Sequence, residues 1–138
     1  MVEPHSVASV LGLRREVRSA PDLIRAVESG LPRLSLRRIV RRVFPAGDGA
    51  RFLRQVIPEA TYHRSGPLSR LYSERAERLA RVVAFAEDVF GDDALAHEWL
   101  RTPHPELEGR AAIEYSISEV GAREVELLLN RILYGLPV

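Results

Sequence analysis

The chain has 138 residues, 46% hydrophobic and 28% charged, a composition typical of one or two small globular domains, and no apolar run approaches the roughly 18 residues of a membrane span. The absence of cysteine excludes disulfides and thiolate chemistry, and the absence of lysine excludes a phosphate-binding loop and Schiff-base catalysis. The net charge of +1 divides unequally, because residues 1–65 hold twelve Arg against six acidic residues and residues 66–138 hold eight Arg against thirteen.

In the basic half, residues 1–65, hydrophobic periodicity is weak at first and then becomes that of α-helices. Residues 1–20 carry no clear periodicity, whereas residues 21–28 have the pattern of a short helix stopped by Gly30. A stronger amphipathic helix is predicted for residues 34–44. Its apolar stripe consists of Leu36, Ile39, Val40, Val43 and Phe44. Its opposite face carries Arg37, Arg38, Arg41 and Arg42.

Two further short helices are expected after a turn. Asp48 can cap a helix that contains Phe52 and Val56, and Pro58 fits the first turn of another over residues 58–64. A basic helix followed by two short helices is the outline of a helix-turn-helix, and a basic half suits nucleic acid as its partner. A generic three-helix bundle with a solvated arginine face has the same pattern and remains an alternative.

The acidic half follows a break at residues 65–70. Ser73 can cap the strongest helix, which ends at Phe90, and Asp92 can cap the next, which runs through Leu100. The residues of that second helix expected to face inward are Leu95, Ala96 and Trp99. A proline-stiffened loop over residues 102–109, a short helix over residues 111–115 and a last helix from Ser118 to Leu133 complete the chain.

The predicted fold class is therefore all-α, since no segment alternates for long enough to be a confident strand. Residues 1–20 form an N-terminal segment, residues 21–68 a helix-turn-helix domain and residues 69–138 a C-terminal helical domain.

No catalytic constellation is apparent, and we expect neither an enzyme nor a cofactor or metal site. His97-Glu98 begins like a zinc-protease motif, but Arg101 stands where the second histidine belongs. His104 lies beyond the end of that helix, next to prolines, in a poor position to share a metal with His97. Trp99 is expected in the core rather than as a stacking platform.

Residues 73–135 resemble the toxin-binding domain of the Xre/MbcA/ParS antitoxins. The features that carry the resemblance come in order: an Arg-rich helix ending in "EDVFGD", then "A..WL.TP.P.L.G", a short helix, and "GAREVE.LL.RI.YG". The upstream "DLIRAVESGLP" and the degenerate helix-turn-helix resemble the Xre-like N-terminal domain of the same family. This sequence departs from the family at His104, at Glu108 and in the "AAIEYSIS" segment.

The resemblance implies that the partner is a RES-domain toxin that consumes NAD, and that the C-terminal region neutralises it by lying over the NAD pocket. Polar positions of the last helix would face a cleft that receives an anionic dinucleotide, and an apolar tail with a tyrosine anchor would plug it. The expected toxin-binding residues are Arg123, Leu127, Asn130, Arg131, Leu133, Tyr134, Gly135, Leu136 and Pro137. Closure of the protein's own core is the alternative role for Arg131 and Tyr134.

The resemblance also implies a homodimer, within a 2:2 or larger toxin–antitoxin complex that binds its own operator DNA. The expected DNA contacts are Arg37, Arg38, Arg41, Arg42, Thr61, Tyr62, His63 and Arg64. We expect a cytoplasmic protein without a membrane partner, because the N-terminus lacks the features of a signal peptide. A stand-alone dimeric helix-turn-helix repressor is the alternative function.

Overall fold

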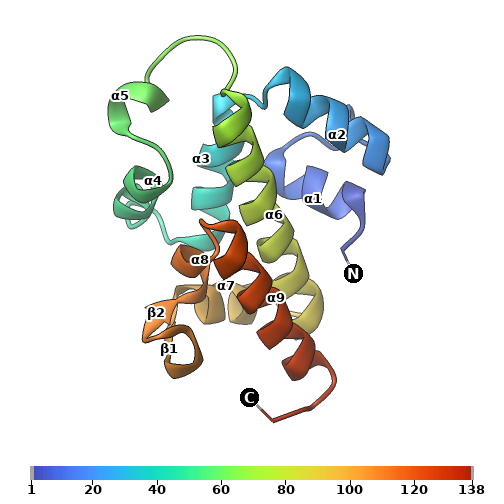
Figure 1. The fold of residues 1–138 in the computed structure, drawn as a ribbon, viewed down its shortest axis with the longest axis vertical. Coiled ribbons are helices and arrows are strands. Elements are labelled where there is room, and N and C mark those ends of the chain that lie inside the picture. The colour runs from blue at the N-terminus through green and yellow to red at the C-terminus, as the bar shows by residue number, and fades with distance from the viewer. Residues whose placement is uncertain (1, 138) are drawn as a thin grey trace.

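The computed structural model describes residues 2–137, and within them the chain forms nine α-helices and one small antiparallel ribbon (Figure 1). The N-terminal helices are α1 (Pro4–Leu11), α2 (Ala20–Ser29), α3 (Arg33–Val43), α4 (Ala50–Val56) and α5 (Glu59–Tyr62). The C-terminal helices are α6 (Arg70–Phe90), α7 (Asp93–Arg101), α8 (Ala112–Tyr115) and α9 (Glu119–Leu133). The all-α fold class is confirmed, and none of the described helices is both long and apolar enough to cross a membrane.

The 21-residue helix α6 is the centre of the molecule. It packs against α1, α2 and α3 from the N-terminal part and against α7, α8 and α9 from the C-terminal part (Figure 1). Small residues such as Ala76 and Ala80 are fully buried, which lets several helices approach the same stretch of α6. A single hydrophobic cluster consequently extends from Val7 in α1 to Leu129 in α9.

Helix α1 is a structural element that the weak patterning of residues 1–20 did not predict. Pro4 occupies its first turn, and Gly12 ends it in the left-handed region at φ 78°. Its residues Val7, Val10 and Leu11 are buried, and their i, i+3, i+4 spacing is that of one helical face. Residues 4–11 therefore belong to the core.

Two of the predicted helix caps are wrong. Ser69, not Ser73, accepts a hydrogen bond from the first turn of α6, and Ser73 is instead fully buried, where it accepts a hydrogen bond of 2.8 Å from the Leu31 amide. Gly49, not Asp48, is the N-cap of α4. A side chain at Gly49 would overlap a Val40 methyl group, so this close approach to α3 favours glycine.

The predicted helix over residues 58–64 is shorter than expected, because α5 is a single turn over Glu59–Tyr62. The Arg33 guanidinium, from the first turn of α3, donates hydrogen bonds to the Thr61, Tyr62 and Gly66 carbonyl oxygens. These carbonyl groups are held by a side chain from another helix, and the chain turns away at Gly66, where φ is 84°.

The C-terminal elements follow the predictions closely. Asp92 caps α7 and Ser118 caps α9. Ala96 and Leu100 are buried in α7 and Trp99 is half-buried, but Leu95 is 55% exposed, contrary to expectation. The predicted loop contains a 3-10 turn, η1 (Pro105–Leu107), between two-residue strands β1 (Pro103–His104) and β2 (Arg110–Ala111), which pair antiparallel.

Candidate functional site

The last helix, α9, is seated closely on the short helix before it. The Ser118 hydroxyl accepts a hydrogen bond of 3.0 Å from the Gly121 amide, which satisfies a donor of the first turn. A side chain at Gly121 would lie 1.8 Å from the Tyr115 carbonyl oxygen, so only glycine permits this approach. The spacing of α9 predicts a buried stripe of Ala122, Val125, Leu128, Leu129 and Ile132. The first four are buried, and Ile132, in the last turn, is half-buried.

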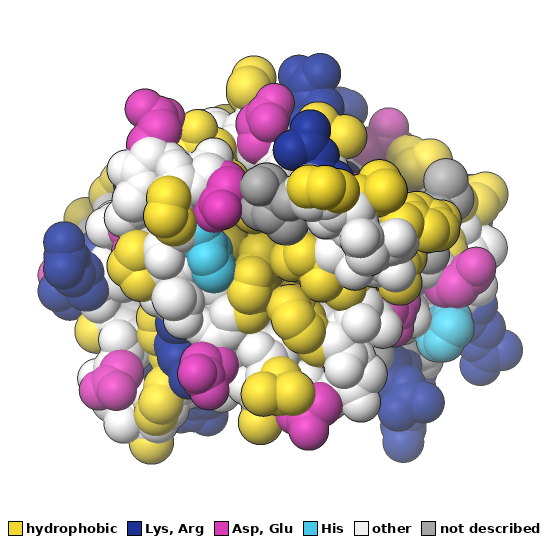
Figure 2. Space-filling view, turned by 90° about the horizontal axis from the view of Figure 1, so that it is seen from below, with side chains coloured by type: hydrophobic (Ala, Val, Ile, Leu, Met, Phe, Trp, Pro, Cys, Tyr) yellow, Lys and Arg dark blue, Asp and Glu magenta, His cyan; other side chains and the backbone are white. Residues whose placement is uncertain are grey.

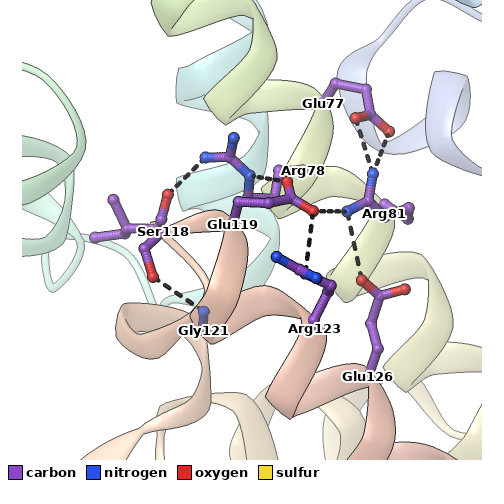
Figure 3. A network of polar contacts seen from close by, with 9 residues as sticks. Glu77, Arg78, Arg81, Ser118, Glu119, Gly121, Arg123 and Glu126 are labelled. Atoms are coloured by element: carbon purple, nitrogen blue, oxygen red, sulfur yellow. Dashed lines mark hydrogen bonds and ion pairs between the residues drawn. The ribbon is translucent and has the colours of Figure 1, made fainter.

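Ion pairs fix the direction of α9 on α6 (Figure 3). Arg78 bridges to the Glu119 carboxylate at 3.0 Å and donates to the Ile117 carbonyl oxygen at 2.7 Å. Arg81 lies between Glu77, at 3.1 Å, and Glu126, at 3.4 Å. Burial raises the pKa of the Glu77 carboxyl against the opposing pull of Arg81. The outer face of α9 is therefore presented in one orientation.

The predicted toxin-binding residues form the outward face and the end of α9. Leu127, Tyr134 and Leu136 are 54%, 72% and 55% exposed, and Arg123 and Arg131 are also exposed. In the view from below, hydrophobic side chains gather near the middle of this end of the molecule, with charged side chains around them (Figure 2). Because Tyr134 and Arg131 are exposed, they do not close the protein's own core.

Sequence reasoning missed one exposed apolar residue of this face. Val120 is 63% exposed, the second-highest value among the exposed large hydrophobic residues. It stands seven residues before Leu127, a separation of about two helical turns, so both side chains leave α9 on the same side. That spacing was the signal that could have identified it.

The end of α9 is folded rather than extended. Gly135 adopts the left-handed region at φ 65°, and the Leu136 amide donates a hydrogen bond of 2.8 Å to the Arg131 carbonyl oxygen. This six-residue closure is the backbone pattern of a Schellman motif. It fixes the backbone of residues 131–136 before any partner arrives, so binding would require less ordering of this segment.

A small hollow of about 80 Å³ lies between α9 and the 3-10 turn η1. Leu107, Leu127 and Leu128 form its apolar part, and Glu106 and Arg131 border it. The proline-stiffened loop thus contributes to the same surface as the end of α9. The hollow is too small for a nucleotide.

The two histidines that suggested a metal site have structural partners instead. His97 Nε2 lies 2.6 Å from a Glu87 carboxylate oxygen. His104 Nε2 lies 2.9 Å from the Trp99 carbonyl oxygen, and its ring packs on the indole with centroids 4.7 Å apart. Within residues 2–137 no group of three metal-ligating side chains comes together.

The predicted DNA contacts fall on two separate elements. Arg37, Arg38 and Arg41 are exposed on α3 and border one open groove beside α1. His63 and Arg64 are exposed just after α5, whereas Thr61 and Tyr62 are half-buried.

The last of the four α3 arginines predicted to contact DNA is paired with a carboxylate of another helix. Arg42 makes two hydrogen bonds, of 2.7 and 2.9 Å, to the two oxygens of Glu87 on α6. Glu87 also contacts His97, so this carboxylate joins α3, α6 and α7. Burial alone would raise the pKa of Glu87, but the hydrogen bonds from Arg42 and His97 outweigh it and hold the pKa below its ordinary value.

Comparison with known families matches both parts of this architecture. Residues 22–81 match the antitoxin Xre-like helix-turn-helix domain, and residues 85–135 match the antitoxin Xre/MbcA/ParS C-terminal toxin-binding domain. The chain belongs to the Xre/MbcA/ParS antitoxin family.

Among curated members of this family, a protein named Antitoxin Xre from Pseudomonas putida is 33% identical over 85 residues. The match covers 59% of this chain and 54% of that protein, so the chain spans about half the length of its curated relative. Neither domain of the Xre/MbcA/ParS architecture is enzymatic, which agrees with the expectation from the sequence that the chain is not an enzyme. The helix-turn-helix match extends to residue 81 and thus takes in the first half of α6.

Proposed function

We propose that the chain is an antitoxin that neutralises a cognate RES-domain, NAD-consuming toxin by covering its active site with the end of α9. The observation that carries this proposal is the exposed apolar end of α9, where Tyr134 and Leu136 are 72% and 55% exposed. Large apolar side chains that cluster on the surface of a soluble protein are typical of sites that bind another protein.

The chemistry of this surface suits the cleft of a NAD-binding protein. The ring of Tyr134 and the side chain of Leu136 are large apolar groups that can fill a pocket. Arg131 is exposed beside them and makes no ion pair among residues 2–137, so its guanidinium is available to donate hydrogen bonds to carboxylate or carbonyl oxygens of a partner. Occupation of that cleft would exclude NAD by competition.

The helix-turn-helix half would place the complex on its own operator DNA, as a homodimer within a 2:2 or larger assembly. This part of the proposal rests on the basic charge of residues 1–65, on the family's helix-turn-helix domain and on the symmetry of palindromic operators. A cytoplasmic location would give the chain access to both partners.

The test is to co-express the cognate toxin with a chain truncated after Asn130 and to follow growth and cellular NAD. The buried residues of α9 all precede Asn130, so the truncated chain should fold, bind DNA and fail to protect NAD. A finer pair of variants is Tyr134→Ala/Leu136→Ala against Leu71→Ala/Leu95→Ala, since Leu71 and Leu95 are each 55% exposed away from α9.

Full protection of NAD by the truncated chain would contradict active-site occlusion by this segment. The alternative, a stand-alone repressor, predicts that no toxin co-purifies with the full chain while operator binding is intact. Co-purification of the product of a neighbouring reading frame separates the two functions.

A further inference from the structure

The C-terminal end of α3 is in contact with a helix of the other domain. The match to the helix-turn-helix domain ends at residue 81, so Glu87 and the whole of α7 lie outside that domain. Helix α7 nevertheless packs directly against α3 as well as against α6. Two polar connections between α7 and the last turn of α3 accompany this packing.

Arg101 of α7 makes the first connection. Its guanidinium donates a hydrogen bond to the carbonyl oxygen of Val43, the last residue of α3. Carbonyl groups in the last turn of a helix have no amide of the same helix left to accept from, and a cation beside them is favoured by the helix dipole. Val43 is buried and Arg101 is half-buried, so water can replace this hydrogen bond only in part. Arg101 is therefore a C-terminal cap of α3 that another helix supplies.

His97, one turn earlier on α7, makes the second connection. Its Nε2 atom lies 2.6 Å from a carboxylate oxygen of Glu87. The same carboxylate accepts two hydrogen bonds from Arg42, in the last turn of α3. Because Arg42 and Val43 are adjacent, α7 holds the end of α3 at two neighbouring residues, once directly and once through Glu87.

Helix α7 is itself held at both ends. At its start, the Asp92 carboxylate accepts a hydrogen bond of 3.0 Å from the Leu95 amide. Near its end, the Trp99 indole packs on the rings of Phe90 and His104, with centroids 5.8 and 4.7 Å apart. These contacts attach α7 to the end of α6 and to the ribbon that follows, so α7 can serve as a fixed support for α3.

The last turn of α3 determines where the next helix, α4, lies. Phe44 comes directly after α3, and its ring packs on that of Phe52 in α4, with centroids 5.3 Å apart. Gly49, the N-cap of α4, lies against Val40 of α3. A shift of the last turn of α3 would therefore move α4 with it. Contact with DNA requires the helices of a helix-turn-helix to keep a fixed geometry relative to one another.

We propose that α7 of the toxin-binding domain positions α3 for DNA binding, and that Arg101 and His97 are the positioning residues. Neither side chain contacts DNA in this arrangement, since each acts through the end of α3. The inference rests on the DNA binding proposed above. It makes the toxin-binding domain necessary for both functions of the chain.

The experiment compares two variants of the full chain that remove equal charge. Arg101→Gln removes one positive charge and the hydrogen bond to Val43. Its matched control, Arg78→Gln, removes one positive charge and a hydrogen bond to the Ile117 carbonyl oxygen, on the side of α6 that faces α9. Arg78 also pairs with Glu119, so the control loses at least as much intramolecular bonding. Binding to the promoter duplex is measured between about 50 and 200 mM NaCl, at a temperature where circular dichroism shows both variants to be folded.

Arg101→Gln should bind the promoter duplex about tenfold more weakly than the wild type, whereas Arg78→Gln should stay within about threefold. The slope of log K against log salt should be the same for Arg101→Gln and the wild type, because a residue that contacts no phosphate releases no counterion. Loss of a direct phosphate contact would instead lower the slope by about 0.9. Arg101→Lys, which keeps the charge and a donor, should recover most of the affinity. In co-expression with the toxin, Arg101→Gln should still protect cellular NAD.

A second pair of variants tests the same inference if Arg101→Gln does not fold. His97→Ala removes the contact with Glu87 and leaves the pairing of Glu87 with Arg42 in place. It should therefore weaken promoter binding by a smaller factor, about threefold, again without a change in the salt slope. The amide of His97→Gln can donate to the same carboxylate, so this variant should bind like the wild type.

Equal promoter affinities of Arg101→Gln and Arg78→Gln would overturn the inference and leave the proposed DNA binding intact. A lower salt slope for Arg101→Gln would also overturn it, since Arg101 would then be a direct DNA contact. Joint loss of promoter binding and toxin protection in Arg101→Gln would contradict a specific effect on α3. A wild-type chain that does not bind the promoter duplex would overturn both this inference and the DNA-binding part of the proposed function.

Discussion

Replacing Glu87 by Gln should loosen the junction at which α3, α6 and α7 meet. The Glu87 carboxylate accepts two hydrogen bonds from Arg42, at 2.7 and 2.9 Å, and lies 2.6 Å from His97 Nε2. The side chains of Glu87 and His97 are only 11% and 14% exposed, so water can replace few of the hydrogen bonds that the substitution removes. An amide keeps the shape of the carboxylate but leaves the Arg42 guanidinium without its counter-charge.

The size of the effect follows from these contacts. A hydrogen bond to a charged group contributes about 1.5–3 kcal/mol, but Arg42 is 34% exposed and the amide still offers one acceptor oxygen. We therefore expect Glu87→Gln to lower the free energy of unfolding by about 2–3 kcal/mol. For a chain of this length, about 3–5 °C of Tm per kcal/mol gives a decrease of about 6–15 °C.

The assay is thermal and urea unfolding at pH 7, with Glu74→Gln as the control. Glu74 is also on α6 and pairs with Arg70 at 3.0 Å, but both side chains are exposed, so its loss should change stability by less than about 1 kcal/mol. The combined variant Arg42→Gln/Glu87→Gln should be less destabilised than the sum of the single variants. Equal effects of Glu87→Gln and Glu74→Gln would refute the reasoning.

Three further outcomes are expected. The pKa of the Glu87 carboxyl is held below its ordinary value in the folded protein. Its contribution to stability is therefore complete above its pKa in the unfolded chain, about 4.3, and is lost as the pH falls through the lower pKa of the folded state. The difference in free energy of unfolding between wild type and Glu87→Gln, measured with urea, should close below about pH 4. Gly121→Ala should lower stability by about 1–3 kcal/mol in thermal unfolding, because its methyl group meets the Tyr115 carbonyl oxygen, whereas Gly47→Ala, where a side chain meets open space, should cost less despite its positive φ. Ser73→Ala should cost about 1–3 kcal/mol, measured in the same way, because it leaves the buried Leu31 amide without its acceptor, and an equal effect of Ser69→Ala would contradict that assignment.

Much of the fold could be predicted from the sequence because its helices carry local signals. The Asp92 cap and the extent of α9 are properties of short stretches, and the structure has both close to the prediction. Helix α1 also has such signals, in Pro4 and Gly12, but over only eight residues its periodicity is weak evidence.

The sequence predictions that are wrong concern residues whose structure depends on a contact with a residue far away in the chain. Ser73 has the residue type of a cap, yet it is buried because the Leu31 amide, 42 residues away, needs an acceptor. Residues 58–64 have the pattern of a helix, but Arg33 holds the carbonyl groups at the end of α5 from outside the segment. The DNA contacts predicted on α3 likewise depend on which arginines are paired, and the pairing of Arg42 with Glu87, 45 residues away, cannot be seen in the order of residues.

Helix α6 belongs to the cores of both halves, so it holds the two halves in one fixed relative position. This helix is about 31 Å long, and α3 and α9 both pack directly on it. A protein bound at the end of α9 would thus keep one distance and one angle to whatever lies on α3, in contrast to partners joined through a flexible tether. One residue inserted in the middle of α6 would turn one surface about 100° relative to the other, at the expense of the shared core.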